Sequence, residues 1–398
     1  MKKLRYTPVI FVLLLTACNK YDIQPEQANG FIKFYSSTLT EQAYDVKETA
    51  DGGYVAIGAT NDEEGLRAIY MVKTDKYGNE ESWSPAILSG DYDAVGTSIQ
   101  VESDGYVILG YSKEADTSDY DIYLVKTDLQ GNMVWETRTG ADSDERSGNL
   151  LVTSSGEYLA AARRYDKVYG KYNYRIVLFN TSGVVVRESI VNSDGIDASA
   201  LNAYIIENQD NYIICGTENI LGKNVINVIL LVKENLRSER NEDYTQSGDL
   251  TGNCIQELSD GNLLVCGTRS NPSTGMGDIY LNKITASLGT VAGWETAKTF
   301  PGEDGQVSLS GKAVRIIDDN SYAVVGTRTE TGNDDIILLH SDASGTEVSR
   351  QIFGDEEFQQ GMSLEVTGSD GGLILVGNNG SEDNSMIALV KTDAAGKL

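Results

Sequence analysis

Short apolar runs alternate with polar turns along almost the whole chain, and one arrangement of them recurs. In residues 103–135 (SDGYVILGYSKEADTSDYDIYLVKTDLQGNMVW), an Asp-Gly turn leads into the apolar run 106–109, which Gly110 closes. A polar loop then leads to a second apolar run at 121–126, a turn that contains Gly131, and a run that ends at Trp135. Runs of this length, rich in β-branched and aromatic residues and bounded by Gly, Asp and Asn, are typical of β-strands.

The same arrangement occurs seven times. The residue that closes the first apolar run recurs at intervals of 51 to 59 residues, at Gly58, Gly110, Ala161, Gly216, Gly267, Gly326 and Gly377. An Asp-Gly or Asn-type pair, which favours a tight hairpin, precedes most copies. A unit of this length with four short strands is typical of a propeller blade rather than a helical repeat. Its third strand is apolar nearly throughout, as a strand buried between neighbouring blades should be. We therefore predict an all-β fold, a seven-bladed β-propeller of four-stranded blades.

The ends of the chain indicate how the ring closes. The last repeat stops at 396–398, where its fourth strand should begin. In two other repeats, Trp83 and Trp135 stand 23 residues before the tyrosine of the next repeat's second strand, and the same offset before Tyr54 falls on Phe31. We expect the segment around Phe31 to pair with the last blade, because an open array would leave exposed strand edges.

The N-terminal segment has the pattern of a targeting signal. Three basic residues precede the apolar run 9–15, which is too short to span a bilayer. The following Leu-Thr-Ala-Cys resembles the lipobox of bacterial lipoproteins, in which the cysteine becomes the lipidated first residue of the mature chain; a simple secretory signal is the alternative. The predicted division is a lipoprotein signal peptide at 1–17, the lipidated Cys18 with a polar tether at 18–29, and the propeller at 30–398.

The charge balance excludes some partners. Lys and Arg number 32 against 59 Asp and Glu, which gives a net charge of −27. A nucleic-acid-binding protein needs a basic footprint, so no nucleic-acid partner is expected. An anionic membrane surface would also repel this chain, so a lipid rather than charge would hold it at the membrane. We expect a monomeric outer-membrane lipoprotein that faces the periplasm or the cell surface.

The repeat sequences themselves resemble a known family. DIYLVKTDLQGNMVW together with SDGYVILGYS is similar to the bacterial propeller repeats called SBBP repeats, and to propeller lipoproteins of Bacteroidota-type bacteria. The resemblance covers nearly all of 30–398 and implies the propeller fold, but propellers host enzymes, receptors and scaffolds alike. Residues 131–135 also resemble the tryptophan motif of PQQ-type propellers. The spacing from Asp128 to Gly131 is one residue shorter, however, and the chain has no vicinal cysteine pair, so quinone binding is not supported.

Few residues carry recognisable catalytic chemistry. The one histidine, His340, stands where other repeats carry Lys73, Lys126 and Lys391, so a structural role is expected. No HExxH, EF-hand, P-loop or GxSxG motif is present. Cys215, Cys254 and Cys266 are interpreted as small buried side chains. Cys254 and Cys266 flank the Asp-Gly turn at 260–261, so a disulfide between these two is left open.

Acidic residues concentrate in the loops between blades and in those that lead into the third strands. In a propeller these loops share one face, so their carboxylates are expected around one mouth of the central channel. They would suit Ca²⁺, a cationic partner or the two-carboxylate chemistry of glycoside hydrolysis; alternatively they cap turns and face water. The candidate metal ligands are Asp93, Asp121, Asp144 and Asp335.

One loop, 162–174 (ARRYDKVYGKYNY), is locally basic and aromatic in an otherwise acidic chain. Tyr and Arg are enriched at binding hot spots, and Tyr rings also stack on sugars. An exposed long loop without a ligand is the alternative. The candidate ligand-binding residues are Arg163, Arg164, Tyr165, Tyr169 and Tyr172.

Two functions are compatible with these observations. The favoured one is a lipid-anchored binding or scaffold propeller that engages a protein or glycan partner through its loop faces, with no required cofactor and Ca²⁺ as the one metal considered. The alternative is a carbohydrate-active enzyme that uses carboxylates at the channel mouth. Two carboxyl groups roughly 5–9 Å apart in a deep pocket beside aromatic residues would favour the enzyme, whereas a shallow, evenly acidic mouth would favour binding.

Overall fold

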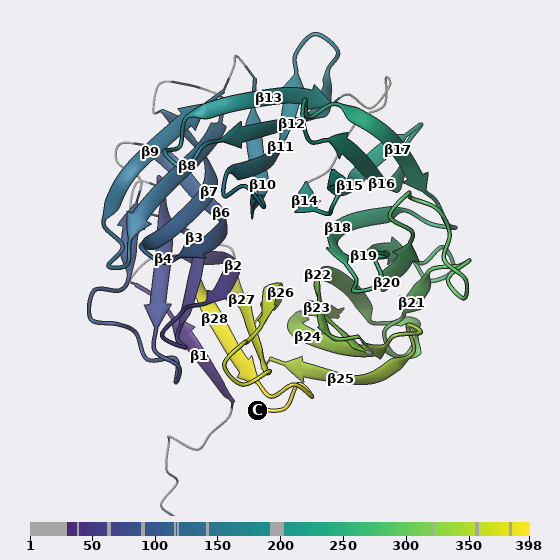
Figure 1. Cartoon of the computed structure of the whole chain (residues 1–398). Helices are drawn as coiled ribbons and strands as arrows, with labels where there is room; N and C mark the ends of the chain where they lie inside the picture. The colour runs from purple at the N-terminus through teal and green to yellow at the C-terminus, as the bar shows by residue number, and fades with distance from the viewer. Residues whose placement is uncertain are drawn as a thin grey trace, which may run out of the picture.

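Seven antiparallel sheets of four strands each surround a central axis (Figure 1). The structure is a computed structural model that describes residues 30–398 apart from 38–39, 62–64, 89–91, 115–116, 118, 141–142, 192–202, 320, 355–357 and 382–383. In each sheet the first strand of the blade lies nearest the axis and the fourth lies at the rim. The prediction of a seven-bladed, all-β propeller is confirmed.

The first four blades follow the order of the chain. Blade 1 contains β2 (Glu41–Glu48), β3 (Tyr54–Asn61), β4 (Arg67–Thr74) and β5 (Ala86–Leu88). Blade 2 contains β6 (Tyr92–Glu102), β7 (Gly105–Glu114), β8 (Asp121–Asp128) and β9 (Met133–Thr139). Blade 3 contains β10 (Glu145–Val152), β11 (Tyr158–Asp166), β12 (Lys171–Phe179) and β13 (Val185–Val191). Blade 4 contains β14 (Tyr204–Glu207), β15 (Asn211–Ile220), β16 (Lys223–Val232) and β17 (Ser238–Tyr244).

The last three blades include the closure of the ring. Blade 5 contains β18 (Leu250–Glu257), β19 (Leu263–Ser270), β20 (Gly277–Ile284) and β21 (Lys298–Phe300). After a 3₁₀ turn, η2 (Glu303–Gly305), blade 6 contains β22 (Ser308–Asp318), β23 (Ser321–Glu330), β24 (Asn333–Asp342) and β25 (Glu347–Phe353). Blade 7 contains β26 (Gln359–Val366), β27 (Leu373–Ser381) and β28 (Asn384–Thr392), and its outer strand is the N-terminal β1 (Phe31–Tyr35).

The first strand closes the ring as the offset of Phe31 predicts. β1 runs antiparallel to β28, with Phe31 opposite Lys391 and Tyr35 opposite Ile387. The ring of Phe31 lies 6.1 Å from that of Tyr54 in blade 1, as Trp135 in blade 2 lies 6.3 Å from the corresponding tyrosine of blade 3. An aromatic side chain at the rim of one blade therefore packs on the second strand of the next.

The repeated polar residues hold the hairpin turns. Lys73 at the end of β4 donates to the Asp51 carboxylate at 2.8 Å, and Lys391 makes the same bond with Asp370 in blade 7. His340 takes the lysine position in blade 6, where its Nδ1 lies 3.3 Å from a serine hydroxyl and its ring packs under a turn glycine. These contacts agree with the structural role expected for the histidine, and burial lowers its pKa.

The core lies between the blades, where apolar side chains of adjacent sheets meet. All three described cysteines are buried free thiols. Cys254 and Cys266 lie directly opposite each other on β18 and β19, so the register that a disulfide would need is present although no disulfide is formed. The Cys254 thiol instead points to blade 6, with its Sγ 3.8 Å from the Val314 carbonyl.

Candidate functional site: the central channel

A β-bulge in the innermost strand of the blade places side chains on the central axis. In six of the seven blades a bulge lies next to the residue that closes the first apolar run, and one extra residue of the innermost strand is displaced from the regular pairing. A bulge bends its strand and redirects the extra residue. In blade 4 the corresponding residue is Ala203, which stands just before β14 and lines the same cavity as the bulge residues. The six bulge residues and Ala203, here called the bulge ring, are Tyr44, Thr97, Asn149, Ala203, Asn253, Lys312 and Met362.

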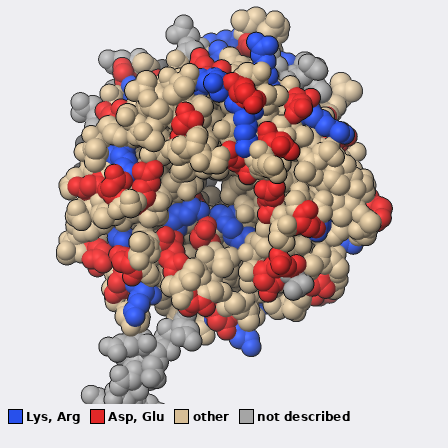
Figure 2. All heavy atoms as spheres, viewed as in Figure 1, with Lys and Arg blue, Asp and Glu red and all other residues tan. Residues whose placement is uncertain are grey.

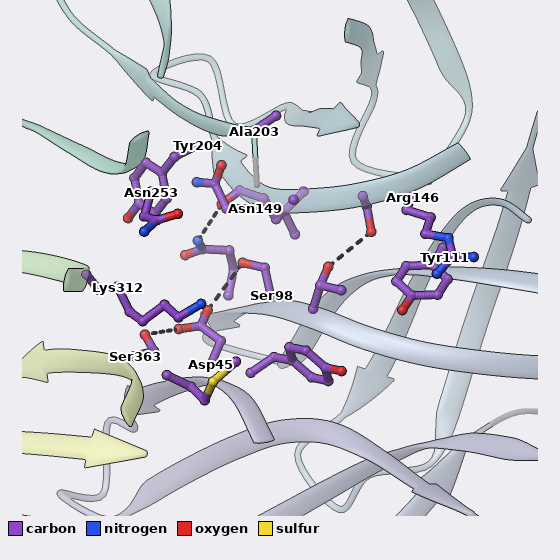
Figure 3. A pocket seen from close by; sticks show the side chains of 18 of the residues that line it. Asp45, Ser98, Tyr111, Arg146, Asn149, Ala203, Tyr204, Asn253, Lys312 and Ser363 are labelled. Atoms are coloured by element: carbon purple, nitrogen blue, oxygen red, sulfur yellow. Dashed lines mark hydrogen bonds between the residues drawn. The ribbon is translucent and has the colours of Figure 1, made fainter. Parts of the chain in front are cut away.

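Every member of the bulge ring lines one cavity of about 340 Å³ on the axis of the propeller (Figure 3). This volume falls in the range of small-molecule sites, which begins at about 300 Å³. Its walls combine three tyrosines, seven neutral hydroxyl or amide side chains, five cations and one carboxylate. The charged and aromatic residues that line the cavity outside the bulge ring are Asp45, Lys47, Tyr111, Arg146, Arg163, Tyr204 and Arg315.

Part of this polar lining joins neighbouring blades. The Asp45 carboxylate accepts hydrogen bonds from Ser98 in blade 2 at 3.2 Å and from Ser363 in blade 7 at 2.9 Å, and therefore spans three blades. Asn149 of blade 3 bonds both the N–H and the carbonyl of Ile205 in blade 4, at 2.6 and 3.1 Å. Because these groups have protein partners, the frame of the cavity is held without a ligand.

The cavity is basic although the protein is strongly acidic. Figure 2 shows Asp and Glu spread over the face of the disc, whereas Lys and Arg atoms gather beside the central opening. Part of this charge is neutralised, because Glu365 accepts bonds from Lys47 at 2.9 Å and from Arg315 at 3.3 Å. Burial would raise the pKa of Glu365, but the two cations hold it below the usual value.

Two of the cavity cations have no carboxylate partner among the described residues: Lys312 and Arg163. Lys312 lies on β22 and extends into the cavity (Figure 3), and burial alone lowers the pKa of its ammonium group. Arg163 lies on β11, three blades away, and its guanidinium stacks over the ring of Tyr172 at 4.7 Å. Both side chains are partly buried, and placing a cation away from water without a counter-charge is unfavourable.

Aromatic and basic side chains also gather where blades 1 to 3 meet the cavity. Tyr111 and Tyr120 pack edge to face with ring centroids 5.2 Å apart. The Arg146 guanidinium lies 5.6 Å from the first ring and 4.8 Å from the second. Tyr120 donates to Asp93 at 2.6 Å, and Arg67 pairs with the same carboxylate at 2.8 Å. Arg146 and Tyr111 are thus fixed at the wall of the cavity by their neighbours.

The four predicted metal ligands are not brought together. Each carboxylate pairs with a different arginine: Asp93 with Arg67, Asp121 with Arg138, Asp144 with Arg146, and Asp335 with Arg328. None of the four lines the cavity. Among the described residues, no three His, Cys, Asp or Glu side chains are close enough to hold a metal ion. Within the described part of the chain the axial cavity therefore has more cations than carboxylates in its lining, whereas several acidic residues of the loops between blades, among them those at 355–357, lie outside the described residues.

The predicted aromatic loop is a β-hairpin formed by β11 and β12, and its five candidates separate. Tyr165 and Tyr172 pair across the hairpin with rings 5.1 Å apart. Arg164 bonds the buried Glu145 at 3.4 Å, while Arg163 reaches the central cavity. Only Tyr169 is freely exposed, at 74%, beside Val168 at 85% at the tip.

Sequence reasoning missed the bulge ring, including Lys312. A usable signal was present, because Gly96, Gly252, Gly311 and Gly361 each precede a bulge-ring residue and stand 14 to 16 residues before the closing glycine. These glycines recur, whereas the residue after each of them differs from blade to blade. A repeated glycine next to a variable residue marks a place where the backbone comes close and the side chain is free to differ.

Comparisons with known proteins agree with the fold. No protein-family model and no curated protein sequence matches this chain. Solved structures do match. The β-propeller domain of the Trilobed protease from Pyrococcus furiosus, described as having an open velcro topology, has a TM-score of 0.51 at 10% identity, covering 92% of this chain and 96% of that one. Kuenenia stuttgartiensis hydrazine synthase has a TM-score of 0.55 at 10% identity, covering 90% and 97%.

Two hydrolases match over about half of their length. A puromycin hydrolase S511A mutant has a TM-score of 0.57 at 12% identity, covering 89% of this chain and 52% of that one. Pyrococcus horikoshii acylaminoacyl peptidase is likewise matched over 52% of its length, so this chain spans about half the length of both hydrolases. At such low identity the likeness shows the fold alone. The chain is a seven-bladed β-propeller with a cation-lined axial cavity.

The predicted signal peptide, the lipidated Cys18 and the tether at 18–29 lie outside the described residues. Within the described part of the chain, no helix has the length and apolar character needed to cross a membrane.

Proposed function

We propose that this protein is a lipid-anchored binding propeller, of the bacterial propeller-repeat lipoprotein type, that takes up part of a glycan in its axial cavity. The observation that carries the proposal is the cavity itself, to which all seven blades contribute side chains. Its walls present hydroxyl and amide groups such as Thr97 and Asn253, together with the rings of Tyr44 and Tyr111. Hydrogen-bonding groups beside aromatic faces suit sugars, which have both hydroxyl edges and apolar faces.

The lining of the cavity favours binding over the hydrolase alternative. Glycoside hydrolysis ordinarily needs two carboxyl groups on either side of the scissile bond. Asp45 is the one carboxylate among the described lining residues, and its oxygens already accept bonds from Ser98, Ser363 and the Ile99 N–H. A carboxylate engaged in this way joins blades and is poorly placed to act as an acid, a base or a nucleophile.

A glycan array probed with the full-length protein in detergent tests the binding proposal. We expect binding to a restricted set of glycans, weakened at least tenfold by Tyr44→Ala, because this bulge-ring side chain lines the cavity and is only partly buried. Tyr169→Ala is the matched control, since it removes the same ring from the exposed hairpin tip. Thermal unfolding of each variant verifies that the fold is kept.

The reverse result would relocate the binding surface. If Tyr169→Ala weakens binding and Tyr44→Ala does not, the partner docks on the hairpin, where the adjacent Val168 is also exposed, and the cavity proposal is wrong. An array without any bound glycan removes the glycan proposal as a whole.

The membrane anchor is proposed on the lipobox-like residues that end at Cys18. We expect the protein expressed in a Gram-negative host to incorporate labelled palmitate and to partition into the detergent phase. Cys18→Ser should abolish both, because the thiol is the site of attachment. Cys215→Ser is the control, since that thiol is fully buried within blade 4. Equal labelling of the Cys18→Ser protein and the wild type would remove the anchor from the proposal.

A further inference from the structure

We propose that the axial cavity selects an anionic ligand, and that Lys312 binds its carboxylate or phosphate group. The proposal rests on the glycan-binding function given above and makes it narrower: the sugar held in the cavity is an acidic one. The net charge of −27 gives no hint of this, because it describes the whole chain. The cavity has the opposite sign.

The first argument is the unmatched charge of the cavity. Five of its lining residues are Lys or Arg and one is Asp. Glu365, beside the cavity, compensates Lys47 and Arg315 jointly, and Asp144 compensates Arg146. Lys312 and Arg163 are left without a carboxylate among the described residues, which is an excess of positive charge in a partly dehydrated space. An anion that enters would find an electrostatic interaction stronger than it has in water.

The second argument is that the protein itself does not supply the missing anion. Asp45 is the acid of the cavity lining, and its oxygens accept bonds from the hydroxyls of Ser98 and Ser363. Among the described residues, the Asp45 carboxylate forms an ion pair with the Lys47 ammonium group, at 3.9 Å. Asp45 is thus occupied in joining blades 1, 2 and 7, and the Lys312 ammonium makes no ion pair with it.

The third argument is the position of Lys312. It stands in the bulge ring between Gly311 and Ala313, so its displacement toward the axis follows from the backbone of β22. The equivalent residues of the other blades are uncharged, from Thr97 in blade 2 to Met362 in blade 7. A single ammonium in a ring of neutral side chains marks one blade as the place where a ligand's charge would sit. Burial lowers the pKa of the Lys312 ammonium group, as expected for a partly buried cation with no anion bound beside it.

Arg163 and Arg146 complete the arrangement on the opposite side of the ring, in blade 3. Both guanidinium groups lie against tyrosine rings, at 4.7 Å from Tyr172 and 4.8 Å from Tyr120. Arg146 gives its Nε–H to Asp144, and a guanidinium group has further N–H donors in its plane that suit a carboxylate or phosphate. A ligand with its charge at Lys312 would therefore have further basic groups at the far wall of the same cavity.

The test compares three sugars that differ in one substituent. NMR titrations of the full-length protein in detergent use galactose, galacturonic acid and galactose 6-phosphate. We expect at least one of the acidic sugars to bind at least tenfold more tightly than galactose. Tighter binding of galacturonic acid identifies a carboxylate ligand, and tighter binding of galactose 6-phosphate identifies a phosphate ligand. Equal affinity for galactose and both acidic sugars, or no binding of any of the three, would overturn the inference.

Variants of Lys312 assign the effect to this residue. Lys312→Met keeps most of the length and removes the charge, so it should weaken binding of the acidic sugar at least tenfold and leave any binding of galactose unchanged. Lys312→Arg keeps the charge and should lose less than threefold. Lys76→Met, in an exposed turn of blade 1, removes an equal charge outside the cavity and should have no effect. Undiminished binding to the Lys312→Met protein would overturn the assignment.

Stability measurements separate a binding role from a structural one. Because Lys312 is partly buried and makes no ion pair among the described residues, the Lys312→Met protein should unfold at the same or a higher temperature than the wild type. A residue that supports the fold would behave in the opposite way, so a marked decrease in the unfolding temperature would contradict the inference. A positive glycan array without any preference for acidic sugars would leave the proposed function intact while this inference fails.

Discussion

A chain that begins at residue 36, and so lacks β1, should lose about 5 kcal/mol of its free energy of unfolding. The strand contributes a buried Tyr35, whose hydroxyl donates to the Gly78 carbonyl at 2.7 Å, and Phe31, whose ring packs on Tyr54. Burying two such side chains is worth about 3–6 kcal/mol, and loss of the ladder to β28 adds to this cost. Typical domains are stable by about 5–15 kcal/mol in total, so the shortened protein should be marginal.

Urea unfolding of two truncated chains measures the effect. The chain that begins at residue 30 retains β1 and serves as the control, since it lacks only the residues before the propeller. The exposed edge of β28 should also make the shorter chain prone to self-association. A synthetic peptide of residues 30–36 added in trans should restore stability by rebuilding the edge strand. Equal unfolding midpoints for the two chains would show that the ring does not depend on its closing strand.

Gly110→Val should cost about 3 kcal/mol, for a reason that the bulge explains. A Cβ at Gly110 would lie 2.1 Å from the Val95 carbonyl oxygen and 3.0 Å from its carbon, both of them backbone atoms of the facing strand β6. Overpacking a well-filled core costs typically about 1–3 kcal/mol, and here the atoms in the way belong to backbone that cannot rotate aside. Glycine is therefore required by the close approach of the two strands at the bulge.

Blade 3 supplies the control for this prediction. Ala161 stands at the equivalent position, where the facing strand β10 also has a bulge with one extra residue, between Ser147 and Leu150. Ala161→Gly should cost no more than about 1 kcal/mol, the usual penalty of glycine in a strand. Comparison of urea midpoints gives both values. A Gly110→Val protein that unfolds like the wild type would show that β6 can move away and that the recurring glycine has another cause.

Features that repeat in every blade could be predicted from the sequence. The closing residues and the Asp-Gly or Asn-type turns report local geometry that recurs from blade to blade, and the 23-residue aromatic offset recurs at Phe31, Trp83 and Trp135. Seven copies of one pattern made the number of blades unambiguous, and Phe31 identified the strand that closes the ring. Such signals are strong because hairpin geometry depends on neighbouring residues.

The cavity could not be predicted in the same way. A β-bulge shifts the alternation of a strand by one residue, so the face on which Lys312 lies cannot be deduced from a period of two. The acidic residues misled for another reason. A count of carboxylates reports charge but not pairing, and Asp93 and Asp335 meet Arg67 and Arg328 only once separate strands have folded together. The basic lining of the channel is thus a property of the tertiary structure.

The bulge ring has a consequence for how such a protein can diversify. Seven positions line the axial cavity, one in each blade, and the occupants of the six bulged positions range from Thr97 through Met362 to Tyr44 while the bulge itself is kept. The backbone of the bulge fixes the direction of the side chain, so its identity is free to vary. Seven positions that can vary independently surround one cavity. Substitutions at a few of them could therefore change what the cavity binds, without the insertion of a new loop.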